Sequence, residues 1–222
     1  MIFSIFMSMT GGLFKVQNPE IATTIISLIT LIVALYALTA WKKQHKIKIL
    51  TSFLDELTDN VHEFTQLMNI PLQHLKLIEM LHEEYKYDTN FDSNIKNHSA
   101  ILFIQAHGEE HHKMMRSSLS DCICSYAKIS SLMVKGKVLC IREYSECLSS
   151  CNSLLQQYEI LDLYCANLAI KNRNWENPKV VQNLDFMMRT NNILNKNLLD
   201  AKLKYNAFLE REYTYIFSKC KK

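Results

Sequence analysis

The pattern of apolar positions along this chain is helical over most of its length. Beyond residue 46, apolar residues recur at steps of three and four, the spacing of one face of an α-helix. The first such stripe contains Ile47, Leu50, Leu54, Leu57, Val61, Phe64 and Met68. No long alternation of apolar and polar residues, the pattern of a half-buried strand, is present. The pattern therefore predicts an all-α protein.

Residues 21–40 differ from the rest because they contain no charged residue, glycine or proline. Twenty helical residues span about 30 Å, the thickness of the hydrocarbon core of a bilayer. Ten of these residues are Ile, Leu or Val, which favour insertion, and Trp41 follows at the place of an interfacial aromatic. We therefore expect a single transmembrane helix over residues 21–41, with the lipid bilayer as its partner.

Two other readings of this segment remain open. A buried core helix is one, although soluble helices rarely stay apolar on every face over such a length. A cleaved signal peptide is the other, but no basic region precedes the segment and the apolar run exceeds the usual 7 to 15 residues. Asn18 as N-cap and Pro19 as first helical residue favour a helix that begins here.

The lysines around the apolar segment indicate its orientation. Lys42, Lys43, Lys46 and Lys48 follow it closely, whereas only Lys15 precedes it. Basic residues are enriched on the cytoplasmic side of membrane spans. We expect residues 1–20 to form a short extracytoplasmic or interfacial tail, and the C-terminal part to lie in the cytoplasm below a cell's inner membrane.

The remaining residues are predicted to complete an elongated antiparallel helical bundle. Residues 42–92 should form a juxtamembrane helix with a kink at Pro71 and a short second helix, because proline lacks the N–H that continues a helix. Residues 93–222 should form three long helices, each with an apolar stripe. Gly136 is expected to end the first of them in a left-handed conformation.

The apolar stripes could also pair between chains. The spacing below the membrane matches that of a coiled coil, and tethering to a membrane raises the effective concentration of such a seam. The same apolar positions could therefore form a homodimer. The residues that would pair are Ile47, Leu50, Leu54, Leu57 and Val61.

Composition excludes several functional classes. The four glycines occur only at positions 11, 12, 108 and 136, so no P-loop, dinucleotide-binding turn or G-x-S-x-G elbow is present. The net charge is only +3, and no basic residues interleave with aromatic ones, so we expect no nucleic-acid partner. The seven cysteines show no disulfide spacing, which suits reduced thiols at helix contacts.

The sharpest chemical pattern is HGEEHH at residues 107–112. His107, Glu110 and His111 have the H-x-x-E-H order in which two histidines one helical turn apart bind zinc in some peptidases. The third ligand that such a site needs could only be guessed at, for instance Glu176. His111 also falls on an apolar stripe, where a histidine in the core is the simpler interpretation.

A second metal pattern combines two helices. Glu79-x-x-His82 and Glu109-x-x-His112 have the spacing of the motifs that bind two metal ions in carboxylate bundles. Such motifs usually lie on helices separated by another helix, whereas these two lie on successive ones. The sequence therefore favours a membrane-anchored, non-enzymatic scaffold, sensor or effector without a cofactor, and leaves a membrane-tethered metalloprotein that uses these four residues as the alternative.

Overall fold

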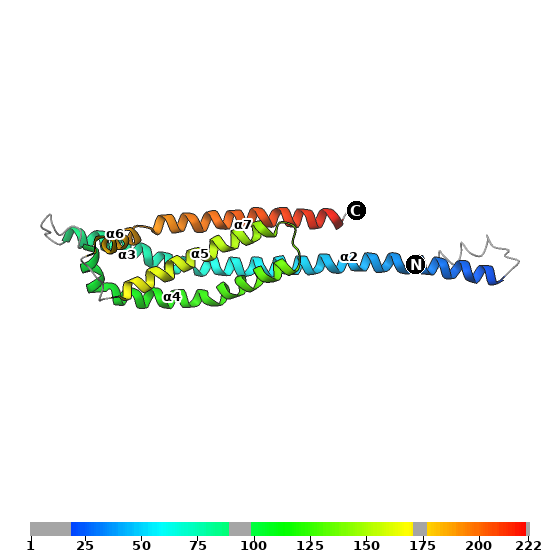
Figure 1. The fold of residues 1–222 in the computed structure, drawn as a ribbon, viewed down its shortest axis with the longest axis horizontal. Helices are drawn as coiled ribbons and strands as arrows, with labels where there is room; N and C mark the ends of the chain where they lie inside the picture. The colour runs from blue at the N-terminus through cyan, green and yellow to red at the C-terminus, as the bar shows by residue number, and fades with distance from the viewer. Residues whose placement is uncertain (1–18, 89–98, 171–176, 221–222) are drawn as a thin grey trace. The chain divides into compact units, whose positions relative to one another are not determined.

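The structure, a computed structural model, describes residues 19–88, 99–170 and 177–220. All regular structure in these ranges is helical, which confirms the all-α prediction (Figure 1). The helices are α2 (Pro19–Leu67), α3 (Asn69–Asp88), α4 (Ser99–Val138), α5 (Tyr144–Ala169), α6 (Pro178–Met188) and α7 (Asn191–Cys220). The chain divides into two compact units, Met1–Ile49 and Leu50–Lys222. Most of the predicted tail, including Asn18, lies outside the described residues.

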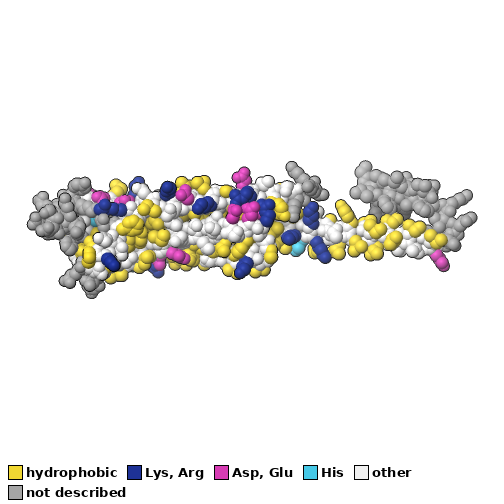
Figure 2. All heavy atoms as spheres, turned by 45° about the horizontal axis from the view of Figure 1, so that its top comes forward, with side chains coloured by type: hydrophobic (Ala, Val, Ile, Leu, Met, Phe, Trp, Pro, Cys, Tyr) yellow, Lys and Arg dark blue, Asp and Glu magenta, His cyan; other side chains and the backbone are white. Residues whose placement is uncertain are grey.

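The first unit contains the apolar part of α2. All ten of its Ile, Leu and Val side chains between residues 21 and 40 are exposed, by 39% to 63%. Figure 2 shows hydrophobic side chains on the surface of this part of the helix. The hydroxyl groups of its threonines and serine instead donate hydrogen bonds to backbone carbonyls three or four residues earlier. A polar side chain satisfied in this way can lie in lipid. By length and composition, this is the one helical stretch in the described ranges that could cross a membrane.

The break between α2 and α3 has the predicted cause. Pro71 has no N–H to donate to the carbonyl of Leu67, and α2 ends at that residue. The backbone turns at Met68, whose N–H still bonds to the Phe64 carbonyl at 2.9 Å. The N–H of Leu72 then bonds to the Met68 carbonyl at 3.3 Å and continues α3.

The second unit is an antiparallel bundle built on the predicted apolar stripes. Helix α4 packs against α3 and α5, and α5 packs against α7 (Figure 1). Contacts across α2 and α7 pair Thr58 with Tyr205 and Asp55 with Tyr213, so residue numbers rise along one helix as they fall along the other. Buried stripe residues include Leu54, Leu57, Val61, Ile104, Met115, Leu119, Cys122, Ile129, Leu155, Leu161, Leu198 and Phe208.

Gly136 does not end α4 as predicted. The helix continues to Val138, and among the described residues the left-handed conformation occurs at Cys140, with φ of 52°. Gly136 lies instead in a close contact, because a Cβ at this position would lie 3.1 Å from Phe53 Cζ and 3.3 Å from Ile141 Cδ1, both atoms at the ends of side chains. The glycine lets α4 approach the aromatic ring on α2.

The last predicted helix is divided into α6 and α7. The sequence predicts three long helices over residues 93–222, but the last of them is interrupted, since α6 ends at Met188 and α7 begins at Asn191. Between them, the N–H groups of Arg189 and Thr190 bond to carbonyls three residues earlier, at 3.1 and 3.4 Å. Thr190 is buried, and its carbonyl accepts the N–H of Leu194 to start the new helix.

Gly108 marks the tightest contact between α4 and α5. A Cβ at Gly108 would lie 2.6 Å from the backbone carbonyl oxygen of Leu168, closer than nonbonded atoms approach. The carbonyl belongs to the last turn of α5 and cannot swing aside as a side chain can. We therefore expect this position to tolerate only glycine without a shift of one helix.

Replacement of Gly108 by alanine should lower the free energy of unfolding. Alanine gains about 1 kcal/mol in helix propensity, but overpacking against a fixed backbone costs about 1 to 3 kcal/mol. We expect Gly108→Ala to be destabilised by roughly 1 kcal/mol net, measured by urea denaturation followed by circular dichroism.

Gly136→Ala is the matched control, because the atoms nearest its new Cβ belong to movable side chains. Its stability should stay within about 0.5 kcal/mol of the wild-type value, since the gain in propensity offsets a small shift of the Phe53 ring. A Gly108→Ala protein as stable as the wild type would contradict the tight α4–α5 contact.

Candidate functional site

Three of the four residues of the predicted metal site make different contacts, and the fourth, Glu79, is half-buried on α3. His82 on α3 is fully buried, with Nε2 3.4 Å from Ser99 Oγ. Glu109 on α4 is exposed and forms an ion pair with Lys113 at 3.3 Å. Within the described ranges, no three His, Cys, Asp or Glu side chains are grouped so that they could hold one metal ion.

His112 contacts α5 through a reciprocal pair of interactions. Its Nδ1 donates a hydrogen bond to the backbone carbonyl of Cys165 at 2.9 Å, and the Cys165 thiol lies 3.6 Å from the His112 carbonyl, to which it donates. This pair is one helical turn beyond Gly108. These two contacts hold α4 and α5 in one position along each other.

The structure instead gathers histidines around Phe103, at the contact of α3 with α4. The ring centroid of Phe103 lies 5.7 Å from that of His82 and 5.6 Å from those of His107 and His111. His111 is stacked on the phenyl ring, with planes 14° apart, and His107 lies 6.4 Å from His111. We call these four residues, together with His74 on α3, the histidine cluster.

The environment of His111 disfavours its protonation. Burial lowers the pKa of His111, and the nearby His107 and His74 lower it further, since each would carry like charge. Glu110 acts in the opposite direction on the same pKa but does not reverse the effect of burial. At neutral pH His111 is therefore an uncharged aromatic ring within the core.

The buried cysteines behave as core residues, as predicted. Cys122, Cys147, Cys151 and Cys165 are all buried. Burial raises the pKa of Cys122 and that of Cys165 to about 11 in each case. Both thiols are protonated at neutral pH, which makes them poor nucleophiles and poor metal ligands. Cys124 and Cys140 are exposed.

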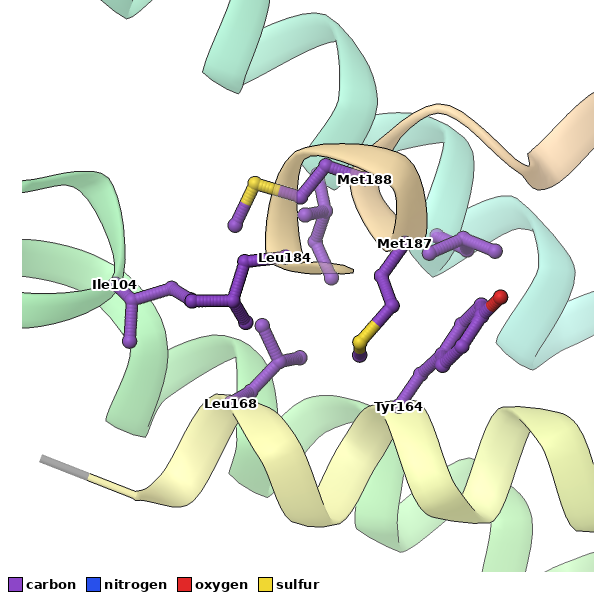
Figure 3. Close-up of a pocket in the computed structure, with 8 residues that line it drawn as sticks. Ile104, Tyr164, Leu168, Leu184, Met187 and Met188 are labelled. Carbon is purple, nitrogen blue, oxygen red and sulfur yellow. The ribbon is translucent and has the colours of Figure 1, made fainter. Parts of the chain in front are cut away.

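A small apolar cavity lies where α6 meets α3, α4 and α5 (Figure 3). Its volume is about 10 Å³, the space of a single water molecule. The side chains of Leu168, Leu184 and Met187 point into it (Figure 3). A cavity of this size holds no organic ligand, so it is an imperfection of packing around the short helix α6.

A network of charges joins the start of α5 to α7. Arg211 Nε lies 2.8 Å from Glu143 Oε2, and Arg142 bonds to Glu143 at 2.7 Å and to Glu212 at 3.2 Å. The guanidinium of Arg142 also lies over the ring of Tyr215, 4.3 Å from its centroid. Burial raises the pKa of Glu212, while the charge of Arg142 opposes this rise.

The sequence patterns contained His82, His107 and His111 but not Phe103, the residue that all three histidine rings contact. Phe103 was part of no motif, and its role depends on α3 lying across α4. A usable signal was present: Phe103, His107 and His111 are spaced i, i+4 and i+8, which places three flat rings on one helical face. The charge network had no comparable signal, because its members are far apart in sequence.

Acidification should weaken the bundle through His111. Because the folded-state pKa of His111 lies below its unfolded value, the unfolded chain binds more protons as the pH falls below about 6.5. Stability is therefore lost as the pH falls through this range. Replacement of His111 by Phe should keep the stacking on Phe103 and reduce the fall in melting temperature between pH 7.5 and pH 5.

His62→Gln is the control, because His62 lies exposed on α2 and its ring bonds to the neighbouring Gln66. This variant should keep the pH dependence of the wild type. Identical pH profiles for His111→Phe and the wild type would show that the histidine cluster does not control acid stability.

Comparison of the chain with models of protein families, with curated proteins and with solved structures finds no match.

Proposed function

We propose that the protein is a single-pass membrane protein whose helical bundle acts by contact at the cytoplasmic face of an inner membrane, as a scaffold, sensor or effector. The observation that carries this proposal is the exposed apolar surface of α2. Ten branched apolar side chains over residues 21–40 are exposed, whereas the same helix beyond residue 52 buries its apolar stripe.

Lipid is the environment that this surface fits. Ten Ile, Leu and Val residues, at about 0.3 to 0.6 kcal/mol each near the centre of a bilayer, favour insertion by roughly 3 to 6 kcal/mol. The hydroxyl groups in the segment are bonded to its own backbone and add little cost. The same side chains in water would form an apolar patch far larger than soluble proteins expose.

The lysines after Trp41 support the cytoplasmic orientation. Lys42, Lys43, Lys46 and Lys48 are exposed on α2 directly after the apolar segment. In this position they would also attract the anionic lipids of the cytoplasmic leaflet, by about 1 kcal/mol each. The orientation remains a proposal that rests on this asymmetry.

Among the contact functions, sensing has a specific observation in its favour. The histidine cluster places several titratable rings at one helix contact, and histidine is the side chain that titrates near physiological pH. Protonation of His111 would put a charge into this contact, loosen α3 from α4 and change the surface offered to a partner. The alternative function, a metalloprotein using Glu79, His82, Glu109 and His112, has weaker support because two of these residues are engaged elsewhere.

The orientation can be tested with two reporters fused after Lys222. A fluorescent reporter that folds in the cytoplasm should be active, and an enzyme that needs export to become active should not be. Replacing the four lysines after Trp41 by glutamine should raise the exported fraction at least severalfold, because the charge asymmetry then favours the N-terminal side.

Lys135, Lys137, Lys202 and Lys204 provide the control, since four exposed or half-exposed lysines changed to glutamine within the bundle should leave the orientation unchanged. An active export reporter in the wild type would overturn the orientation. Recovery of the full-length protein in the soluble fraction would overturn the membrane anchor itself.

A further inference from the structure

The turns of α2 that follow the apolar segment carry several cations and no carboxylate. The basic residues after Trp41 are Lys42, Lys43, Lys46 and Lys48. Between residues 21 and 54 the sequence contains no Asp or Glu, so no acidic side chain of this stretch opposes these charges. An anion is the ligand that suits such a stretch.

Three side chains of these turns lie in a row on one face of the helix. Trp41, His45 and Lys48 are spaced i, i+4 and i+7, and all three are exposed. The indole of Trp41 and the imidazole of His45 are stacked, with ring centroids 5.3 Å apart and planes 9° apart. Stacking aligns the two rings along the helix, and each ring carries an N–H donor at its edge. We call these three residues the Trp41 row.

The direction of helical side chains turns the Trp41 row toward the apolar segment. In an α-helix the Cα–Cβ bond tilts toward the N-terminus, and long side chains follow it. The apolar segment lies on the N-terminal side of the row. Lys48 can therefore extend its ammonium group along the helix toward the level of the two rings. An anion held near the end of the apolar segment would meet donors from all three residues.

We propose that the Trp41 row binds the phosphate group of an anionic phospholipid. This inference rests on the proposed membrane anchor, which would place residue 41 at the polar boundary of a bilayer, and it names the lipid class and the residues that hold it. The two ring N–H groups would donate hydrogen bonds to phosphate oxygens, and the Lys48 ammonium would neutralise the charge. A lipid of net negative charge is favoured over a zwitterionic one, whose headgroup would bring a cation next to the lysines.

A site on one face differs from general attraction by the lysines. General attraction weakens with distance from the membrane surface, and Lys43 lies closer to the apolar segment than Lys48. Lys43 lies about 200° of helical rotation beyond Trp41, on the other side of α2, whereas Lys48 lies close to two full turns beyond it and returns to the same face. The proposed site therefore depends more on Lys48 than on Lys43, and general attraction predicts the reverse.

Trp41 can report on its own lipid neighbours by fluorescence. Full-length protein with Trp175→Phe, which leaves Trp41 as its one tryptophan, would be reconstituted into phosphatidylcholine vesicles. A small fraction of the lipid would carry brominated acyl chains, which quench tryptophan on contact, either as phosphatidylglycerol or as phosphatidylcholine. Brominated phosphatidylglycerol should quench Trp41 as though it were enriched roughly fivefold beside the ring. Both leaflets have one composition, so the result does not depend on the orientation of the protein.

Lys48→Gln and His45→Ala should each reduce this enrichment to less than about twofold, because each removes a donor from the Trp41 row. Lys43→Gln is the matched control, since it removes the same charge from the other side of the helix and should keep most of the enrichment. Enrichment is the ratio of quenching by the two brominated lipids in one variant, so a change in the depth of Trp41 cancels. All three positions are exposed, and helix content measured by circular dichroism should match that of the parent protein.

The outcomes separate the lipid site from the anchor. Equal quenching by the two brominated lipids, or an equal loss of enrichment in Lys43→Gln and Lys48→Gln, would overturn the site and leave the anchor standing. Enrichment that survives both Lys48→Gln and His45→Ala would also overturn the site. Protein that fails to float with the vesicles in a density gradient would overturn the anchor, and with it the lipid site.

Discussion

The close approach of α4 to α5 at Gly108 is the contact on which the arrangement of the bundle depends. Only a hydrogen atom fits between this backbone and the Leu168 carbonyl, so the two helices meet there in one register. One turn later, the reciprocal contacts of His112 with Cys165 hold the same register. With α4 fixed in rotation, Phe103 and His111 face the histidines of α3.

The apolar spacing was sufficient to predict the helices and most of the core. Met115, Leu119 and Cys122 follow the helical period, and burial follows that period wherever a neighbouring helix is available. The role of Gly136 could not be predicted in the same way, because it depends on Phe53, a residue far away in sequence. The start of α7 could have been predicted from the sequence, because Thr190, Asn191 and Asn192 form a polar run that favours a helix start.

The candidate sites show where such reasoning stops. Spacing relates residues on one helix, and so Glu109 and His112 were correctly placed one turn apart. The spacing does not show what each side chain contacts. Glu109 is exposed and pairs with Lys113, whereas His112 bonds to a backbone carbonyl on α5. Whether several polar groups converge on one point is decided by contacts between helices, which the spacing within one helix does not contain.

The charge network between α5 and α7 makes one end of the bundle respond to ionic strength. Glu143 bonds to both Arg142 and Arg211, which lie largely in solvent, where dissolved salt screens their attraction. Exposed ion pairs contribute little stability, so they act mainly by holding the two helix ends in place. High salt should therefore let the end of α7 fray locally while the apolar contacts elsewhere persist, so that partial opening begins at this end.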